Sequence, residues 1–204
     1  MKIYIARHGQ NEDNANGILN GHRDKPLTEL GRAQAYELGQ ALTAASISVD
    51  ATYTSPLSRA YETAMIASQV ANLPTPLKHA LLIERDFGIM TGKRADQIEE
   101  ICGDQIIKTK TITYFLEPTG AETFPDLLVR AERLLDAMRN EYKNKSLAFF
   151  THGDIGKMLY AQFYSLPWQK VLTNFHFGNG ELLVLEDGTD PQQSHIVRLS
   201  QYNH

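Results

Sequence analysis

The clearest indication of the fold comes from eight residues near the N-terminus, Ile3-Tyr4-Ile5-Ala6-Arg7-His8-Gly9-Gln10. The first four form an apolar run typical of a buried strand, and an arginine and a histidine follow where that strand would end. A second apolar run, residues 147–151, is followed in the same way by His152-Gly153. In open α/β sheets, functional groups gather at the carboxyl ends of the strands. The two stretches therefore predict a site with two histidines at one edge of a sheet.

The rest of the chain alternates apolar runs with helical patterns. Turn residues bound five candidate strands, over 2–6, 50–54, 146–151, 180–186 and 195–199. Apolar residues at i, i+3, i+4 and i+7 predict helices over 29–44, 57–71 and 122–142. This alternation favours an α/β three-layer sandwich, in which helices flank a mostly parallel central sheet. The Asp187-Gly188 turn before the last strand is typical of a hairpin, so we expect one antiparallel sheet edge.

The chain has no internal repeat, low-complexity tract or long linker. Its 204 residues are enough for one domain with a substantial core. Residues 93–120 are the least periodic part of the sequence. We therefore expect a single domain over residues 1–204, with an irregular insertion near 93–120 that lies over the active site.

Composition limits the partners and the compartment. A net charge of −4 gives no general attraction to nucleic acid or to anionic membranes. No apolar run approaches the roughly 20 residues that span a bilayer, and the N-terminus has no signal-peptide pattern. The single cysteine, Cys102, excludes an internal disulfide and a multi-cysteine zinc site. We expect a cytoplasmic protein without nucleic-acid or membrane partners, in which any anion site is a local cluster of cations.

A histidine next to an arginine indicates phosphate chemistry more than metal binding. A metal site at His8 and His152 would need carboxylate or thiol ligands at suitable spacing, and Arg7 would repel the cation. A neutral imidazole can instead attack phosphorus and form a phosphohistidine. Guanidinium groups neutralise phosphoryl oxygens, and their charge lowers the pKa of a neighbouring histidine. We therefore expect no metal and a phosphohistidine at this site.

Five blocks of sequence resemble the histidine phosphatase superfamily. That superfamily includes cofactor-dependent phosphoglycerate mutases, fructose-2,6-bisphosphatases and broad-specificity phosphatases. The blocks follow one another in the family order and reach from residue 3 to about residue 180, so together they are far more specific than any one alone. They are Arg7-His8-Gly9 with Asn14 and the run 26–35, then 55–64, then 84–88 with Gly92, then 118–123, and finally 151–154.

The resemblance implies five catalytic residues. His8 is the nucleophile, and Arg7, Arg59 and His152 contact the phosphoryl group. Glu84 is the general acid, because a bound phosphate dianion should raise its pKa and favour the protonated form that donates to the leaving alkoxide. After the alcohol has left, the same carboxylate can accept the proton of the attacking water.

Five further residues are expected to bind substrate. The resemblance makes Asn14 an uncharged donor to the phosphoryl oxygens, and Gly153 belongs to the second histidine block. Asn11 stands where the family usually has Ser or Thr, so it would offer an amide instead of a hydroxyl. Arg23 and Lys93 are candidates for contact with a second anionic group.

The segment 106–115 separates two activities. Mutases of the family hold the substrate carboxylate with an adjacent arginine pair in a longer insertion, whereas this segment is shorter and has two lysines, Lys108 and Lys110. A lysine does not reproduce the bidentate fork of arginine. We therefore predict a phosphatase that acts on a small phosphorylated metabolite.

Two other functions are kept as alternatives, a cofactor-dependent phosphoglycerate mutase and a non-catalytic binder of a phosphorylated ligand. The binder is disfavoured because both His8 and Glu84 are present. No cofactor is expected, except 2,3-bisphosphoglycerate if the protein is a mutase. A dimer is common in relatives, so a homodimer is an expectation that no residue of this chain demonstrates.

Overall fold

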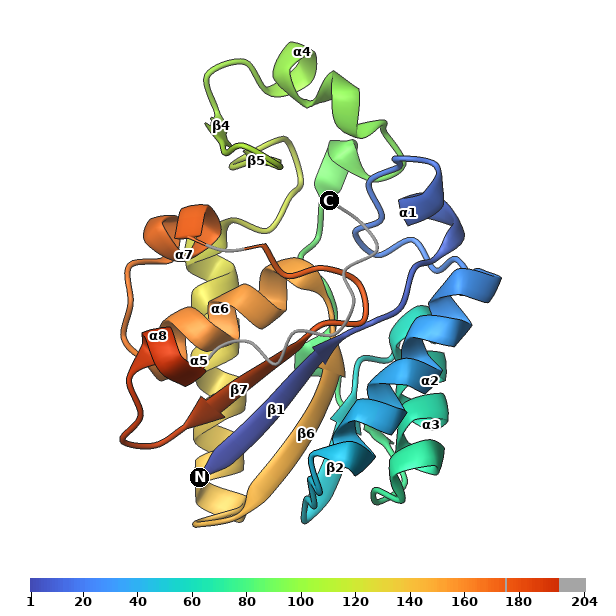
Figure 1. The fold of residues 1–204 in the computed structure, drawn as a ribbon. Coiled ribbons are helices and arrows are strands. Elements are labelled where there is room, and N and C mark those ends of the chain that lie inside the picture. The colour runs from blue at the N-terminus through green and yellow to red at the C-terminus, as the bar shows by residue number, and fades with distance from the viewer. Residues whose placement is uncertain (175, 195–204) are drawn as a thin grey trace.

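A central sheet is covered by helices on both faces (Figure 1). The computed structural model describes residues 1–174 and 176–194. Its strands are β1 (Lys2–Arg7), β2 (Ala51–Thr54), β3 (Leu77–Lys78), β4 (Ile106–Lys108), β5 (Thr113–Phe115), β6 (Ser146–Thr151) and β7 (Leu182–Glu186). Its α-helices are α1 (Glu12–Ala15), α2 (Glu29–Ala44), α3 (Ser58–Ala71), α4 (Ile98–Cys102), α5 (Phe124–Glu141), α6 (Gly153–Phe163), α7 (Trp168–Asn174) and α8 (Pro191–Ser194), with short 3₁₀ turns η1 (Ala80–Leu82), η2 (Gly88–Met90) and η3 (Ala95–Gln97). None of these helices combines the length and apolarity needed to cross a membrane.

The main sheet has the strand order β3-β2-β6-β1-β7. Its pairs are parallel except at the β7 edge, where Lys2 of β1 lies opposite Glu186 of β7 in an antiparallel ladder. One edge of the sheet is therefore antiparallel, as predicted, but the pair that forms it is β7 with β1. The predicted hairpin from 180–186 to 195–199 reaches outside the described residues. The strand predicted over 195–199 lies outside the described residues. Strands β4 and β5 form a separate two-stranded antiparallel sheet.

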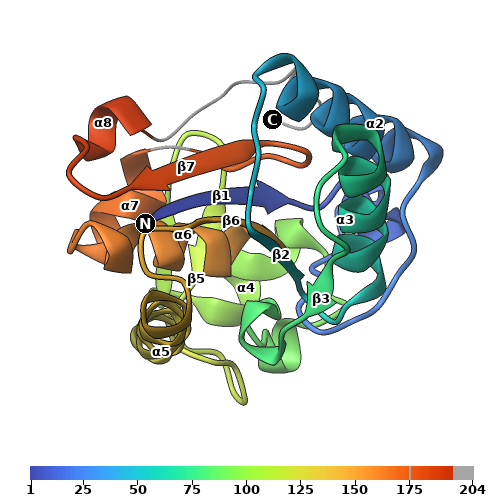
Figure 2. The same ribbon diagram turned by 90° about the horizontal axis from the view of Figure 1, so that it is seen from below.

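The layers follow from the alternation of side chains along each strand. Helices α2 and α3 cover one face of the sheet, and α5, α6 and α7 cover the other (Figure 2). Ile3 and Ile5 of β1 pack into the core on the α5–α6 side, whereas Ala6 packs into the core on the α2–α3 side. Because successive residues of a strand point to opposite faces, a single apolar strand serves both cores. The three-layer α/β architecture is thus confirmed.

Capping residues explain where the predicted helices begin. The Thr28 side chain accepts a hydrogen bond from the Gly31 N–H at the start of α2, and Thr123 accepts one from the Asp126 N–H at the start of α5. Asn72 ends α3 in the left-handed conformation that commonly terminates a helix. The segment 93–120 differs from the prediction of an irregular insertion. It contains α4 and the β4–β5 hairpin, which are too short to produce a periodic pattern.

Candidate active site

The ends of β1 and β6 bring two histidines together. Arg7, the last residue of β1, lies opposite Thr151, the last residue of β6. His8 and His152 each follow directly, and their ring centroids are 5.1 Å apart in an edge-on arrangement. The His8 N–H donates to the Thr151 carbonyl at 3.0 Å, so the main chain holds the two strand ends together beyond the ladder. Both side chains are buried.

The hydrogen bonds of His8 define its tautomer. Its Nδ1 lies 2.7 Å from the Gly9 carbonyl, which only accepts, so Nδ1 carries the hydrogen. Its Nε2 then has a lone pair, and Arg59 Nε donates to it at 3.2 Å. Burial, with the charges of Arg59 and Arg7, lowers the pKa of His8 well below its usual value. His8 is therefore a neutral imidazole with its lone pair on Nε2, and this lone pair becomes free for attack when the Arg59 Nε–H turns to a phosphoryl oxygen instead.

Loop carbonyls hold the two arginines. Arg7 donates to the Phe177 carbonyl, and Arg59 donates to two carbonyls of the loop 21–23 at 2.6 and 2.9 Å. Burial lowers the pKa of Arg59 to about 10, so it stays charged at neutral pH. Arg7 Nε and His152 Nδ1 are buried polar atoms with no hydrogen-bond partner among the described residues. Such atoms are costly to bury unless they bind something. Arg7 lines the cavity described below, so its Nε is a candidate donor to a ligand, whereas His152 is not among the lining residues.

Glu84 is buried at the N-terminal end of α6. Its carboxylate accepts hydrogen bonds from the N–H groups of Arg85 at 2.9 Å, Ile155 at 3.3 Å and Asp154 at 3.4 Å. The last two belong to the first turn of α6. Burial and the nearby Asp154 carboxylate raise the pKa of Glu84, while the Arg85 N–H and the charges of Arg59 and Arg7 act in the opposite direction. A buried carboxyl with a raised pKa is suited to exchange a proton with a ligand.

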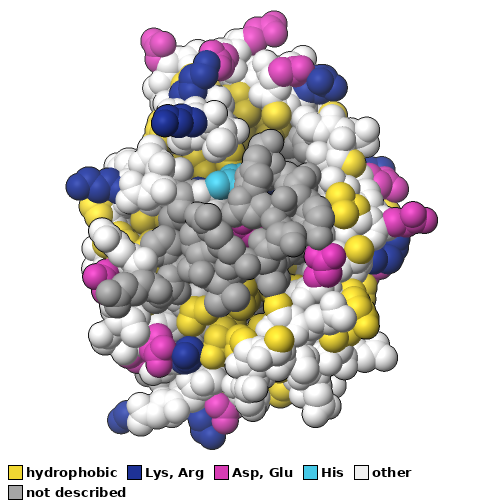
Figure 3. All heavy atoms as spheres, viewed as in Figure 1, with side chains coloured by type: hydrophobic (Ala, Val, Ile, Leu, Met, Phe, Trp, Pro, Cys, Tyr) yellow, Lys and Arg dark blue, Asp and Glu magenta, His cyan; other side chains and the backbone are white. Residues whose placement is uncertain are grey.

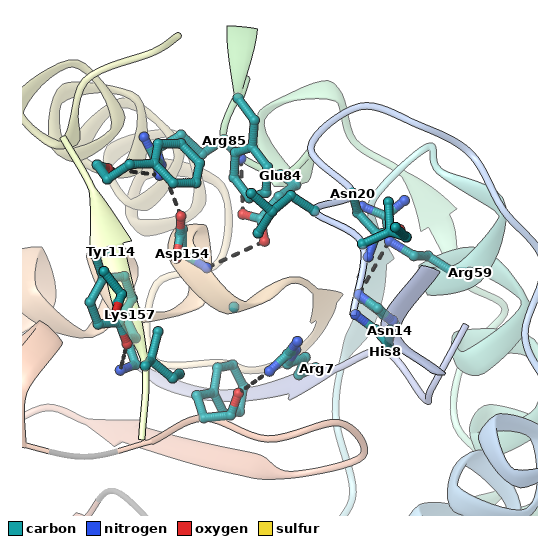
Figure 4. A pocket seen from close by; sticks show the side chains of 18 residues that line it. Arg7, His8, Asn14, Asn20, Arg59, Glu84, Arg85, Tyr114, Asp154 and Lys157 are labelled. Carbon is teal, nitrogen blue, oxygen red and sulfur yellow. Dashed lines mark hydrogen bonds and ion pairs between the residues drawn. The ribbon is translucent and has the colours of Figure 1, made fainter. Parts of the chain in front are cut away.

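A cavity of about 170 Å³ connects these groups (Figure 4). Six of the ten predicted residues line it: Arg7, His8, Asn14, Arg59, Glu84 and Gly153. Asn14 Oδ1 accepts from the side chain of Asn179 at 3.2 Å, so its amide hydrogens are left for a ligand. His152 lies behind His8, with Nε2 2.8 Å from Ser55 Oγ.

Three predicted binding residues do not line the cavity. Asn11 is fully buried and caps α1, and its amide donates to Asn20 at 2.6 Å, so it supports the cavity wall from behind. The Arg23 guanidinium forms an ion pair with Asp13 at 2.8 Å. Lys93 also lies outside the cavity lining. The side chains of Asn11 and Arg23 are already engaged, by capping of α1 and by the ion pair, which is why they do not face the cavity.

The opposite wall contains polar residues that the sequence interpretation missed. Asp154, Lys157, Arg85 and Tyr114 line the cavity. Asp154 and Lys157 are three residues apart, so they share one face of α6. The apolar residues Ile155, Met158 and Leu159 have helical spacing and could have predicted α6 directly after His152. Tyr114 lies on β5, for which the sequence has no clear signal.

Charged side chains of both signs are interspersed around the face shown in Figure 3. No extended cationic field is visible on that face. Within the described residues, no three His, Cys, Asp or Glu side chains gather in a way that could hold a metal ion. Inside the cavity, the guanidinium groups of Arg7 and Arg59 provide positive charge next to His8 that can meet an anion.

This geometry agrees with a comparison of the sequence with known families. A sequence profile of the histidine phosphatase superfamily (branch 1) matches residues 3–200. The chain belongs to the histidine phosphatase superfamily. The resemblance inferred from five short blocks is thus confirmed over nearly the whole chain.

Two relatives of this member of the superfamily are named as mutases. A 2,3-bisphosphoglycerate-dependent phosphoglycerate mutase of Parvibaculum lavamentivorans is 31% identical over 191 residues, which is 90% of this chain and 89% of the relative. The mutase of the same name from Bartonella quintana is 36% identical, but the match covers only 61% of either chain.

Among solved structures, Bacillus stearothermophilus YhfR superposes with a TM-score of 0.78 at 26% identity, over 96% of this chain and 95% of that one. A mycobacterial glucosyl-3-phosphoglycerate phosphatase in complex with VO3 has the same TM-score at 23% identity, over 99% and 98% of the two chains. The second likeness shows the fold alone.

Proposed function

We propose that this enzyme is a phosphatase that hydrolyses a small phosphomonoester through a phosphohistidine on His8. The observation that supports this most directly is the neutral, buried imidazole of His8, whose Nε2 lies in a cavity with two arginines and a buried carboxyl. Phosphoryl transfer depends mainly on positioning and on neutralising the phosphoryl oxygens. The cavity offers both.

The residues divide the reaction into two steps. In the first, His8 Nε2 attacks phosphorus and the bond from phosphorus to the ester oxygen breaks, while Glu84 gives its proton to the leaving alkoxide. Arg7, Arg59 and Asn14 hold the phosphoryl oxygens. In the second step a water attacks phosphorus and gives its proton to Glu84. The bond from phosphorus to nitrogen then breaks, which releases inorganic phosphate and restores neutral His8.

Hydrolysis is favoured over mutase activity by the wall that faces the leaving group. From the segment 106–115, the residues that line the cavity are Ile112, Thr113, Tyr114 and Phe115. Lys108 forms an exposed ion pair with Glu99 outside the cavity. The insertion therefore contributes no guanidinium pair for a phosphoglycerate carboxylate. The mutase remains the second candidate, because the named relatives at 31–36% identity are mutases.

The test is release of inorganic phosphate from a panel of phosphomonoesters, with and without 2,3-bisphosphoglycerate. Wild type should release phosphate without the bisphosphate, and His8→Ala should abolish release. His79→Gln is the matched control, because His79 lies outside the cavity lining. Isomerisation of 3-phosphoglycerate that outpaces phosphate release would instead identify a mutase. Binding of phosphate with neither activity would identify a non-catalytic binder.

The proposal includes no metal and no resident cofactor. 2,3-Bisphosphoglycerate belongs only to the mutase alternative. The proposed phosphatase requires a small phosphorylated substrate as its partner. It requires neither nucleic acid nor a membrane.

A further inference from the structure

The guanidinium of Arg85 is bound away from the carboxyl of Glu84, the residue that precedes it in the sequence. Its Nε donates to the Asp154 carboxylate at 2.8 Å, and its other nitrogens donate to main-chain carbonyls. Among the described residues, the Glu84 carboxyl accepts only main-chain N–H groups and forms no ion pair. Figure 4 shows Asp154 joined to Arg85 through its carboxylate and to Glu84 through its main-chain N–H. Asp154 therefore takes up the cation that is adjacent to Glu84 in the chain.

The side-chain charges that act on the Glu84 carboxyl come from three elements. Arg7 at the end of β1 and Arg59 of α3 favour the carboxylate, whereas Asp154 in the first turn of α6 favours the protonated acid. Burial acts in the same direction as Asp154, and together they raise the pKa of Glu84. Asp154 is thus the anionic side chain that opposes the two arginines.

Other ionisable groups near Glu84 bind its main chain or a different partner. His22 Nε2 lies 2.8 Å from the Glu84 carbonyl oxygen, and Arg130 donates to the same oxygen at 3.2 Å. Lys157, on the next turn of α6, donates to a tyrosine hydroxyl on β5 at 2.6 Å. These contacts hold the Glu84 main chain in place and leave its carboxyl without a cationic partner.

An Arg85 guanidinium without its anionic partner would change the state of Glu84. An arginine within about 4–6 Å of a carboxyl lowers the pKa of that carboxyl by about 1–3 pH units. Arg85 follows Glu84 directly and is 1% exposed, so water and salt would screen its charge little. An ionised Glu84 could still accept the N–H groups of α6, but it would have no proton to give to a leaving alkoxide.

We propose that Asp154 is a positioning residue for the general acid: it binds Arg85, so that this cation does not pair with Glu84, and Glu84 enters the reaction protonated. The inference rests on the proposed phosphatase function and assigns a role to the residue that follows His152-Gly153. Asp154 holds Glu84 with its main chain and Arg85 with its side chain. One residue therefore determines both the position and the protonation of the acid.

Asp154→Asn tests the proposal, because an amide of the same shape can still accept from Arg85 but carries no charge. The pH profile of kcat/KM reports the acid in the free enzyme. For the alkyl phosphomonoester that wild type hydrolyses fastest, the alkaline decline should begin about 1 pH unit lower in the variant. The profile with 4-nitrophenyl phosphate should show no such difference, because its leaving group needs no acid. Asp13→Asn is the matched control, since Asp13 also pairs with an arginine at 2.8 Å but lies outside the cavity lining, and its alkaline decline should match that of wild type.

Carbon-13 NMR of protein labelled at its glutamate carboxyls follows the proton of Glu84 without turnover, and Glu84→Gln assigns the signal. Wild-type Glu84 should titrate above the usual glutamate pKa of about 4.3, and Asp154→Asn should lower the midpoint. Thermal unfolding verifies that the variant folds. The wild-type titration is a test by itself, because a midpoint at or below the usual value would overturn the inference.

The two proposals fail in different ways. Phosphate release with the same alkaline decline in wild type and Asp154→Asn would overturn the role of Asp154 and leave the phosphatase proposal standing. No phosphate release by wild type, with a Glu84 midpoint that falls in Asp154→Asn, would overturn the phosphatase proposal and leave the control of the Glu84 proton standing.

Discussion

Replacement of Arg85 by Met should destabilise the protein strongly, because this guanidinium is an interior cross-link. Arg85 is 1% exposed, and its Nε donates to Asp154 at 2.8 Å. Its other nitrogens donate to the carbonyls of Glu122 and Phe115, both at 3.2 Å. The guanidinium carbon lies 4.3 Å from the ring centroids of Phe115 and Phe124. The substitution keeps the apolar bulk and removes all of these polar interactions.

The loss in the free energy of unfolding depends mainly on the charge that the substitution leaves buried without a partner. Removal of one partner from a buried ion pair costs about 3–5 kcal/mol, because the other charge stays buried without compensation. Here that charge is Asp154, whose side chain is 13% exposed. Loss of the cation–π contacts adds about 1–2 kcal/mol for a desolvated site, and the two contributions overlap. We expect a loss of about 3–5 kcal/mol, which lowers Tm by about 6–20 °C for a chain of this size.

The assay is thermal and urea unfolding with a matched exposed pair as control. Arg94 pairs with Asp96 at 2.9 Å, but the two side chains are 59% and 63% exposed, so Arg94→Met should cost less than about 1 kcal/mol. Adding Asp154→Asn to Arg85→Met should recover part of the loss, since it removes the uncompensated charge. If Arg85→Met proves no more destabilising than Arg94→Met, the prediction that the buried Arg85 guanidinium stabilises the fold is wrong.

Four more outcomes are expected. Glu84→Gln should slow hydrolysis of alkyl phosphates by about 10²–10⁴-fold and of nitrophenyl phosphate far less, because a good leaving group needs no acid; equal losses on both would argue against the acid role. Burial and two arginines lower the pKa of His8, so the imidazole stays neutral as the pH falls through the usual histidine value of about 6.5. The pH–rate profile should therefore show no loss of kcat/KM near that pH from protonation of His8. Phosphate release should be insensitive to a metal chelator, because arginines supply the charge; inhibition by EDTA that added metal reverses would contradict this. Gly9→Ala should reduce both stability and activity, because its Cβ would lie 2.2 Å from the Gly31 carbonyl oxygen, a backbone atom with little freedom to move; full activity in this variant would show that the main chain can adjust.

Patterns of apolar residues were sufficient for the parts of the fold that are long and periodic. They predicted β1, β6 and the helices α2, α3 and α5 to within two residues at each end. They could not predict α4 or the β4–β5 hairpin, because elements of three to five residues carry too little periodicity. Apolar patterns also could not predict that β7 pairs with β1, since this pair joins residues near the two ends of the described chain.

The site was predictable to the extent that strand ends determine it. His8 and His152 meet because their strands are adjacent and in register. The positions of Arg59 and Glu84 came from resemblance to a family, because no local pattern places a residue of α3 or of a loop at a strand end. Lys157 was missed because a lone lysine on a helix is usually exposed, and only tertiary packing buries it.

The β4–β5 sheet is separate from the main sheet, and this separation affects how substrate recognition can change. The nucleophile is fixed by main-chain bonds on two sides, to the Thr151 carbonyl at the end of β6 and from the Gly180 N–H in the turn that precedes β7. The hairpin that supplies Ile112 and Thr113 to the cavity has no ladder with the main sheet. Mutations in the hairpin can therefore alter which alcohol is recognised while the reacting groups keep their geometry. Diversification of substrate range and conservation of chemistry can thus proceed in separate parts of one small domain.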